Sequence, residues 1–213
     1  KLIKLKLFDE KKLFLLRDPI IDKKKNKSFN LRNYKKREKF LAIGRLTKQK
    51  NFSFLIECFE KILIKYENIS LTIAGEGEQK NHLSKMIKNR KLENRIKLIG
   101  YRKNINELYL NHDCFILTSL WEDPGFVLIE AAFHSIPIIT SDCRSGPKEI
   151  SMNGKNMFMF KTNSEKDFLK KFDTFMKIKN FELKKKCKRS RQIVKKFSIH
   201  AHSNSLVNLL NQH

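Results

Sequence analysis

Two glutamates, Glu122 and Glu130, are the residues whose type and spacing most directly indicate chemistry in this sequence. The apolar stretch at residues 114–118 predicts a buried strand, and residues 126–133 predict a helix after it. Glu122 would then follow the carboxyl end of the strand, and Glu130 would lie further along the helix. Because parallel α/β sheets bind ligands outside the carboxyl ends of their strands, we expect both carboxylates on the ligand side.

The turn between the glutamates, at Pro124 and Gly125, precedes the predicted helix. It would direct the backbone amides of Phe126 and Val127 outward at the helix N-terminus, where amides lack intrahelical partners and can bind an anion. Carboxylates that accept from hydroxyl groups, beside amides that donate to phosphate, indicate a sugar nucleotide. On spacing alone, two glutamates near one helix are more often solvated surface residues, so the flanking sequence has to decide.

A cationic loop follows the apolar segment at residues 40–44. Gly44 allows a tight exit from a strand, and Arg45 and Lys50 lie at either end of the loop. A planar guanidinium and a mobile ammonium together suit a diphosphate. In a lysine-rich protein two such cations are more often unrelated to a ligand. Their position at the carboxyl end of a strand is what favours a diphosphate site.

Apolar segments alternate with helical patterns along most of the chain, which predicts an α/β fold with a doubly wound parallel sheet of about six strands. Residues 164–212 are expected to form C-terminal helices with turns near residues 180 and 197–198. The predicted strands are residues 40–44, 69–74, 96–99, 114–118, 137–140 and 157–160, and the predicted helices between them are residues 52–63, 78–89, 105–110 and 126–133.

The net charge of +24 is concentrated at the two ends of the chain. Residues 1–50 carry 18 basic and 5 acidic side chains and residues 151–213 carry 15 and 4, whereas residues 101–150 carry 4 and 7. A nucleic-acid-binding site would combine cations with stacking aromatic residues, but the aromatic residues here are mostly Phe at core spacing. We therefore expect no nucleic-acid partner, whereas an anionic membrane surface would attract the lysine clusters.

The run Glu-Asp-Pro-Gly-Phe-Val-Leu-Ile-Glu-Ala-Ala at residues 122–132 resembles the signature of glycosyltransferase family 4. Ser-Ile-Pro-Ile-Ile-Thr-Ser-Asp at residues 135–142 and Ser-Gly-Pro-Lys-Glu-Ile at residues 145–150 continue the resemblance, which extends over roughly residues 40 to 200. The family consists of retaining enzymes of the GT-B fold, which contains Rossmann-like domains. The resemblance implies transfer of a sugar, with retention, from a UDP- or GDP-sugar donor to a glycan or lipid-linked acceptor.

The resemblance also assigns roles to the residues already singled out. It implies that Glu130 holds the ribose hydroxyls and that Glu122 holds the donor sugar near the reacting carbon. Arg45 and Lys50, together with the amides that follow Gly125, would hold the diphosphate. Glu122, Arg45 and Lys50 are thus the expected catalytic residues.

Three further loop positions bear on this resemblance. Tyr101, after Gly100, resembles the place where the family holds the nucleotide base, although an exposed tyrosine without a ligand would explain it equally well. Gly75-Glu76-Gly77 lacks the third glycine of a dinucleotide fingerprint, so we expect a structural turn there. Asn51 stands where the family usually has Gly, so we expect the geometry of the loop after Gly44 to differ slightly from that of other family members.

The sequence contains no Asp-x-Asp motif of the kind that usually holds a divalent metal in glycosyltransferases. Beside Arg45 and Lys50, this absence favours neutralisation of the diphosphate without a metal, and no cofactor is expected. The four cysteines are widely scattered and contain no Cys-x-x-Cys, which favours a reduced, cytoplasmic compartment and gives no reason to expect a zinc site. A peripheral position at the inner face of the membrane is compatible with the charge.

The expected organisation is a linker with a remnant of an N-terminal domain at residues 1–39, a nucleotide-sugar-binding domain at 40–196 and a C-terminal helix at 197–213. We expect the chain to be the donor-binding half of a longer enzyme that binds donor but catalyses little alone. Two other interpretations stay open from the sequence: a basic nucleic-acid-binding α/β domain driven by the terminal charge, and a degenerate, non-catalytic docking module.

Overall fold

The computed structural model describes residue 14, residues 16–21 and residues 34–211. Two compact units make up the chain: residues 28–194, and residues 1–27 together with 195–213. Within the described part, no helix is long and apolar enough to cross a membrane.

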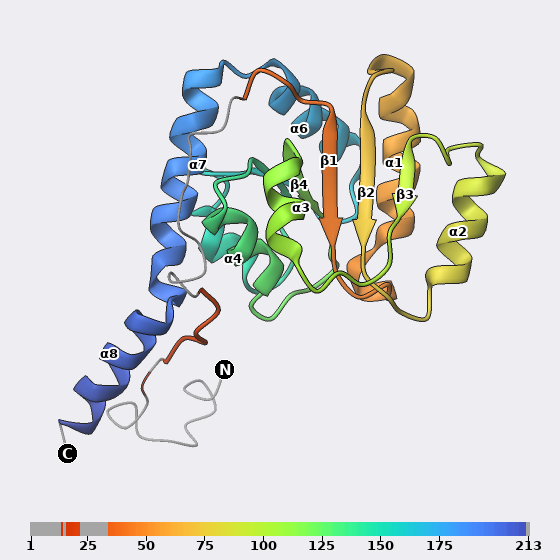
Figure 1. Ribbon diagram of the computed structural model, residues 1–213. Coiled ribbons are helices and arrows are strands. Elements are labelled where there is room, and N and C mark those ends of the chain that lie inside the picture. The colour runs from red at the N-terminus through yellow and green to blue at the C-terminus, as the bar shows by residue number, and fades with distance from the viewer. Residues whose placement is uncertain (1–13, 15, 22–33, 212–213) are drawn as a thin grey trace. The chain divides into compact units, whose positions relative to one another are not determined.

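The larger unit contains a six-stranded sheet in which every neighbouring pair of strands is parallel (Figure 1). The strand order is β3-β2-β1-β4-β5-β6. The strands are β1 Lys39–Ile43, β2 Ser70–Ala74, β3 Ile96–Leu98, β4 Cys114–Leu117, β5 Ile138–Ser141 and β6 Phe158–Phe160. The predicted doubly wound α/β fold is therefore confirmed, and the predicted strand boundaries differ by one residue.

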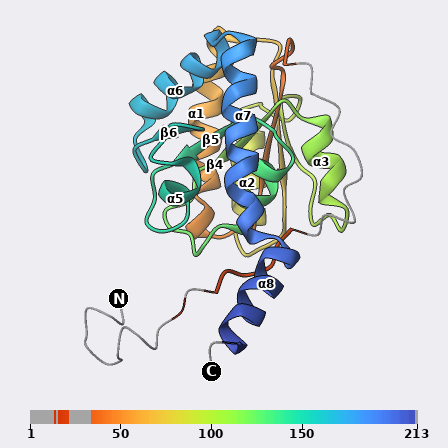
Figure 2. The same cartoon turned by 90° about the vertical axis from the view of Figure 1, so that its left-hand side faces the viewer.

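Helices cover both faces of this sheet, as the two views in Figures 1 and 2 show. The helices α1, α2 and α6 lie on one face, whereas α3 and α4 lie on the other with α7 packed against α4. The elements are the 3-10 turn η4 Lys48–Lys50 and the helices α1 Phe52–Lys65, α2 Lys80–Asn89, α3 Ile105–Asn111, α4 Phe126–Phe133, α5 Pro147–Ser151, α6 Glu165–Lys177 and α7 Asn180–Val194.

Phenylalanines fill the core between β1, α1 and α6. Phe40 of β1 is fully buried, and its ring centroid lies 4.8 Å from that of Phe172 of α6. Phe160 and Phe168 form an edge-to-face pair with centroids 5.0 Å apart. Such aromatic pairs add directional stabilisation to the burial of apolar surface. The abundance of Phe is therefore largely explained by packing, as its spacing predicted.

The smaller unit contains the 3-10 turn η5 Lys195–Phe197 and the helix α8 Ile199–Leu210. The backbone amides of Ile20 and Ile21 both donate to the carbonyl oxygen of Phe197, at 2.9 and 3.0 Å. Ser198 caps α8 by accepting a hydrogen bond from the amide of Ala201. A segment from the start of the chain is thus paired with one near its end inside this unit.

Gly75 and Gly77 allow the loops after β1 and β2 to approach each other closely. A Cβ atom on Gly75 would lie 1.9 Å from the carbonyl oxygen of Gly44, and one on Gly77 would lie 2.5 Å from that of Leu46. The structural role predicted for Gly75-Glu76-Gly77 is confirmed, because the missing side chains bring the two loops together beside the candidate site.

Gly75→Ala should destabilise the chain by roughly 2–4 kcal/mol, because the new methyl group would collide with backbone and its φ of +149° adds strain. Gly154→Ala is the matched control, since Gly154 also has a positive φ of +83° but its Cβ would meet Met159 at an ordinary 3.4 Å. Urea unfolding of both variants measures the difference. Equal losses would show that the close approach at Gly75 is not needed for stability.

Candidate functional site

The candidate site lies where the strand order of the sheet reverses. β1 is hydrogen-bonded to β2 on one side and to β4 on the other, so the loops that leave β1 and β4 start side by side. In an open parallel sheet the crevice at such a reversal is the usual ligand site. All of the predicted site residues follow the carboxyl ends of strands β1, β3 and β4, or lie on the helix after β4.

The loop after β1 is held by its backbone. The amide of Gly44 donates to the carbonyl oxygen of Ala74 at 3.0 Å, and the loop then forms η4. Asn51 ends η4 in the left-handed conformation, with φ 56° and ψ 41°. Asparagine tolerates this conformation better than most residues other than glycine. We expected Asn51, which stands where the family usually has glycine, to change this loop slightly. Asn51 nevertheless adopts a backbone conformation that glycine also favours.

Hydrogen bonds from three donor groups fasten the loop after β4 to the loop after β1. The hydroxyl of Thr118 donates to the carbonyl oxygen of Lys50 at 2.9 Å. The backbone amide of Leu120 donates to the backbone carbonyl oxygen of Gln49 at 2.8 Å. The side-chain amide of Gln49 donates to the carbonyl oxygen of Trp121 at 2.9 Å. These bonds fix the backbone on both sides of Lys50, which positions its side chain.

Lys50 and Glu122 form a nearly buried ion pair. The Lys50 Nζ lies 2.6 Å from Glu122 Oε1, and the two side chains are only 12% and 5% exposed. The hydroxyl of Ser119, which is fully buried, donates to the same carboxylate oxygen at 2.5 Å. A carboxylate with so little exposure requires such partners, because an unpaired buried charge is very costly.

The sequence assigned Lys50 and Glu122 to separate parts of a ligand, and it did not anticipate that they contact each other. An ammonium group has three donors, so Lys50 can keep Glu122 as a partner and still donate to an anion. Ser119 was missed as well. The sequence offered one signal for Ser119, namely its position 3 residues before Glu122 at the carboxyl end of a strand.

The first turn of α4 lies directly after this ion pair. Gly125 precedes α4 with φ 87° and ψ 66°, a left-handed conformation, and a Cβ there would lie 3.4 Å from that of Glu122. The amides of Phe126 and Val127 belong to the first turn and therefore lack acceptors inside the helix. The predicted anion site is thus next to the Lys50–Glu122 pair.

Glu130 is held on α4 by Tyr109 of α3. The hydroxyl of Tyr109, a fully buried residue, lies 3.2 Å from Glu130 Oε2 and 3.1 Å from the carbonyl oxygen of Val127. Burial raises the pKa of the Glu130 carboxyl, and the Tyr109 hydrogen bond opposes that rise. Burial, and then the charge of Glu130, hold the pKa of Tyr109 well above its usual range, so the phenol stays a donor. Tyr109 was not predicted.

A pocket of about 450 Å³ opens over the carboxyl ends of β1, β2 and β3. It brings together three predicted residues, Gly44, Arg45 and Tyr101, and its lining also includes the start of α3. Tyr101 is 73% exposed, so its ring is free to stack on a ligand. The predicted residues thus form three groups: this pocket, the Lys50–Glu122 pair with the first turn of α4, and Glu130 with Tyr109.

The cysteines of the described part of the chain form no disulfide. All four cysteines are free and buried, and burial raises the pKa of Cys58 to about 12, which leaves no nucleophilic thiolate there. Across the described ranges, no group of three His, Cys, Asp or Glu side chains is arranged to hold a metal ion.

Several known proteins resemble this chain in sequence. An uncharacterized glycosyltransferase of Methanocaldococcus jannaschii is 42% identical over 111 residues, which are 52% of this chain and 27% of that protein. The poly(ribitol-phosphate) alpha-N-acetylglucosaminyltransferase of Staphylococcus aureus is 25% identical over 169 residues, which are 79% of this chain and 34% of that enzyme.

Solved structures share the fold. A mutant of S. aureus TarM in complex with Fondaparinux, alpha-GlcNAc-glycerol and UDP has a TM-score of 0.79 at 24% identity, over 99% of this chain and 42% of TarM. The pneumococcal O-GlcNAc transferase GtfA, in complex with UDP and GlcNAc, has a TM-score of 0.74 at 19% identity, over 92% of this chain and 38% of GtfA.

This chain spans less than half of the length of each of these four proteins. The sequence model of one family, described as "Glycosyl transferases group 1", matches residues 23–196, which is most of the chain and includes every predicted site residue. The signature around the two glutamates, the Rossmann-like sheet and this match agree: the chain belongs to the glycosyl transferases group 1 family.

Proposed function

We propose that this chain forms the donor-binding half of a retaining glycosyltransferase, which transfers a sugar from a UDP- or GDP-sugar to a glycan or lipid-linked acceptor. The observation that carries the proposal is the nearly buried Lys50–Glu122 ion pair next to the first turn of α4. A cation and free amides around one crevice suit a diphosphate, and the carboxylate beside them suits the hydroxyl groups of a sugar.

The diphosphate would lie between the loop after β1 and the N-terminus of α4. Lys50 would donate from one side and the amides of Phe126 and Val127 from the other, with Arg45 reaching from the neighbouring pocket. Negative charge grows on the leaving diphosphate oxygen as the glycosidic bond breaks, and donors fixed in advance stabilise that charge most effectively. These donors supply the neutralisation without a metal ion.

The nucleoside would extend from the diphosphate toward β2 and β3. Glu130 accepts from the two ribose hydroxyls, with its carboxylate oriented by Tyr109. The base occupies the pocket of about 450 Å³, against Tyr101. Glu122 faces the sugar on the other side of the diphosphate, where it accepts from a sugar hydroxyl near the reacting carbon.

The acceptor would be bound by an N-terminal domain that packs over the carboxyl ends of the strands. The length of the related proteins supports this, since each is more than twice as long as its match to this chain. An anionic membrane at the cytoplasmic side would be a suitable partner for the lysines at the chain's ends. On this account the chain alone binds the donor and turns over little or none of it.

Lys50→Ala and Arg45→Ala should each weaken binding of UDP or GDP by about ten- to a hundredfold, because each removes a charged hydrogen bond to phosphate worth roughly 1.5–3 kcal/mol. Lys185→Ala is the control, since Lys185 is exposed on α7 away from the site. Titration calorimetry at moderate salt measures the affinities. If Lys185→Ala weakened binding as much as Lys50→Ala, the affinity would be a diffuse charge effect.

The ion pair makes Lys50→Ala a special case, because it leaves Glu122 as a buried charge without its cation. We therefore expect it to lower stability by about 3 kcal/mol or more, and Glu122→Gln in the same chain to restore much of that loss. Arg45→Ala, at an exposed residue, should leave stability almost unchanged. Unfolding of the single and double variants separates the stability effect from the binding effect.

Glu130→Gln and Glu122→Gln should affect different ligands. Glu130→Gln should weaken the nucleoside diphosphate itself, because a neutral amide is a poorer acceptor for two ribose hydroxyls than a carboxylate. Glu122→Gln should weaken the intact sugar nucleotide more than the nucleoside diphosphate, whose binding it can change only through its ion-pair partner Lys50. One titration series with both ligands tests this, and equal losses of both ligands in both variants would refute the division of roles.

Binding of UDP or GDP should not require magnesium. The donors around the crevice are cations and amides, and they neutralise a diphosphate directly. Calorimetric titration in the presence of a chelator and then with magnesium measures the difference. A strict requirement for magnesium would contradict the assignment of Lys50, Arg45 and the α4 amides to the diphosphate.

A further inference from the structure

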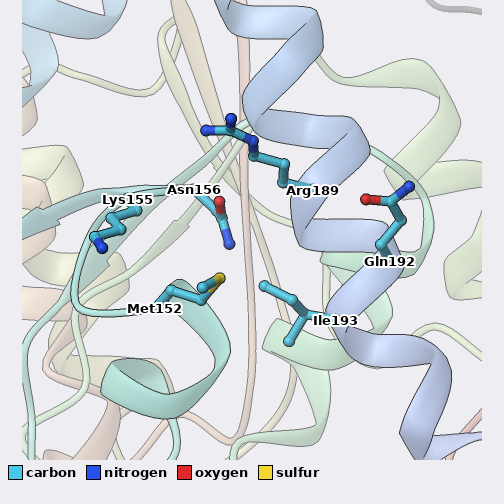
Figure 3. A pocket seen from close by; sticks show the side chains of 6 residues that line it. All are labelled: Met152, Lys155, Asn156, Arg189, Gln192 and Ile193. Atoms are coloured by element: carbon cyan, nitrogen blue, oxygen red, sulfur yellow. The ribbon is translucent and has the colours of Figure 1, made fainter.

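A second pocket, of about 600 Å³, lies where the connection from α5 to β6 faces α7 (Figure 3). Its volume is in the range of small-molecule sites. It is lined by Met152, Lys155 and Asn156 from the connection and by Arg189, Gln192 and Ile193 from α7. None of these residues belongs to the candidate donor site, and β6 is at the opposite end of the strand order from the pocket over β3.

Asn156 is the unusual residue of this second pocket. It is only 4% exposed, and its backbone is fixed because its amide donates to the carbonyl oxygen of Ser151 and its carbonyl oxygen accepts from the Ser190 hydroxyl, both at 3.2 Å. Its side-chain Oδ1 and Nδ2, in contrast, have no hydrogen-bond partner among the described residues. Figure 3 shows this amide directed into the space between Met152 and Ile193.

A buried amide without partners costs free energy, so such groups in folded proteins are normally satisfied by protein, water or a ligand. A water molecule fits where the cavity is polar and offers several partners. Here the neighbours of the Asn156 amide inside the pocket include the apolar side chains of Met152 and Ile193. This surrounding favours an organic ligand that has its own apolar part.

The charge around the second pocket is positive. Arg189 is exposed and extends from α7 toward the α5–β6 connection (Figure 3). Among the ion pairs of the described residues, none involves Arg189. Lys155 lines the same pocket with its ammonium group pointing outward. A guanidinium without an acidic partner beside an apolar pocket is suited to bind a carboxylate in a bidentate arrangement.

We propose that this pocket binds a small organic anion that carries an amide group and an aliphatic part. Oδ1 and Nδ2 of Asn156 are shielded from solvent, so the ligand enters as the neighbouring side chains shift and uncover them. The ligand amide then pairs its own donor and acceptor with these two atoms, its carboxylate pairs with Arg189, and its aliphatic part packs on Met152 and Ile193. Free N-acylated amino acids and the carboxyl terminus of a peptide share this chemistry. The proposal does not depend on donor binding, since no residue is shared.

The test uses the full 213-residue chain with isotope-labelled methionine methyl groups and N-acetyl-L-leucine as the probe. The Met152 methyl signal should shift saturably at millimolar probe, whereas Met86 on α2 and Met176 on α6 should not shift. N-acetyl-L-leucine amide lacks the carboxylate and 4-methylpentanoate lacks the amide, so each should bind about tenfold more weakly. A short peptide ending in leucine, compared with its amidated form, distinguishes the peptide source from the free compound.

Matched variants assign the contacts. Asn156→Ala and Arg189→Gln should each weaken the probe about tenfold, whereas Lys185→Gln on the same helix should not. Asn156→Ala should not lower the unfolding temperature, because it removes a buried amide that has no hydrogen bond to lose; should it not fold, Arg189→Gln decides. The absence of a saturable Met152 shift, or equal affinities of Arg189→Gln and Lys185→Gln, would overturn the proposal and leave a pocket that holds water only.

Discussion

The ion pair between Lys50 and Glu122 is the interaction on which the candidate site depends. Its two members come from loops that leave neighbouring strands at the reversal of the strand order, and further hydrogen bonds fasten those loops together. Because both side chains are nearly buried, neither can be removed without leaving the other uncompensated. The same pair places a cation and a carboxylate beside the first turn of α4, so the proposed donor site would couple stability to ligand binding in one contact.

The rest of the larger unit holds that contact in place. The core of phenylalanines between β1, α1 and α6 sets the position of β1, and Gly75 and Gly77 allow the loop after β2 to support the loop after β1. On the other face, Tyr109 of α3 orients Glu130 on α4. Lys50, Glu122 and Glu130 are therefore each held by a residue from an element outside their own.

The sequence was sufficient to predict the sheet, because buried parallel strands are short apolar runs. The helices between them are recognised by apolar stripes with a different period. Together with the resemblance to glycosyltransferase family 4, the sequence was also sufficient to place Glu122 after β4 and Glu130 on α4. It did not reveal that Lys50 pairs with Glu122, or that Ser119 and Tyr109 hold the two carboxylates. Those contacts depend on side-chain directions across loops, which no periodic pattern encodes. The unpartnered amide of Asn156 likewise became visible only when its neighbours were known.

The most direct test of the account is a crystal structure of this chain with UDP bound. The account predicts the diphosphate within hydrogen-bond distance of Lys50 Nζ and of the amides of Phe126 and Val127, with the ribose hydroxyls on Glu130 and Lys50 still in contact with Glu122. A diphosphate bound instead to the lysines of α7, with the crevice between the loops after β1 and β4 unoccupied, would contradict it.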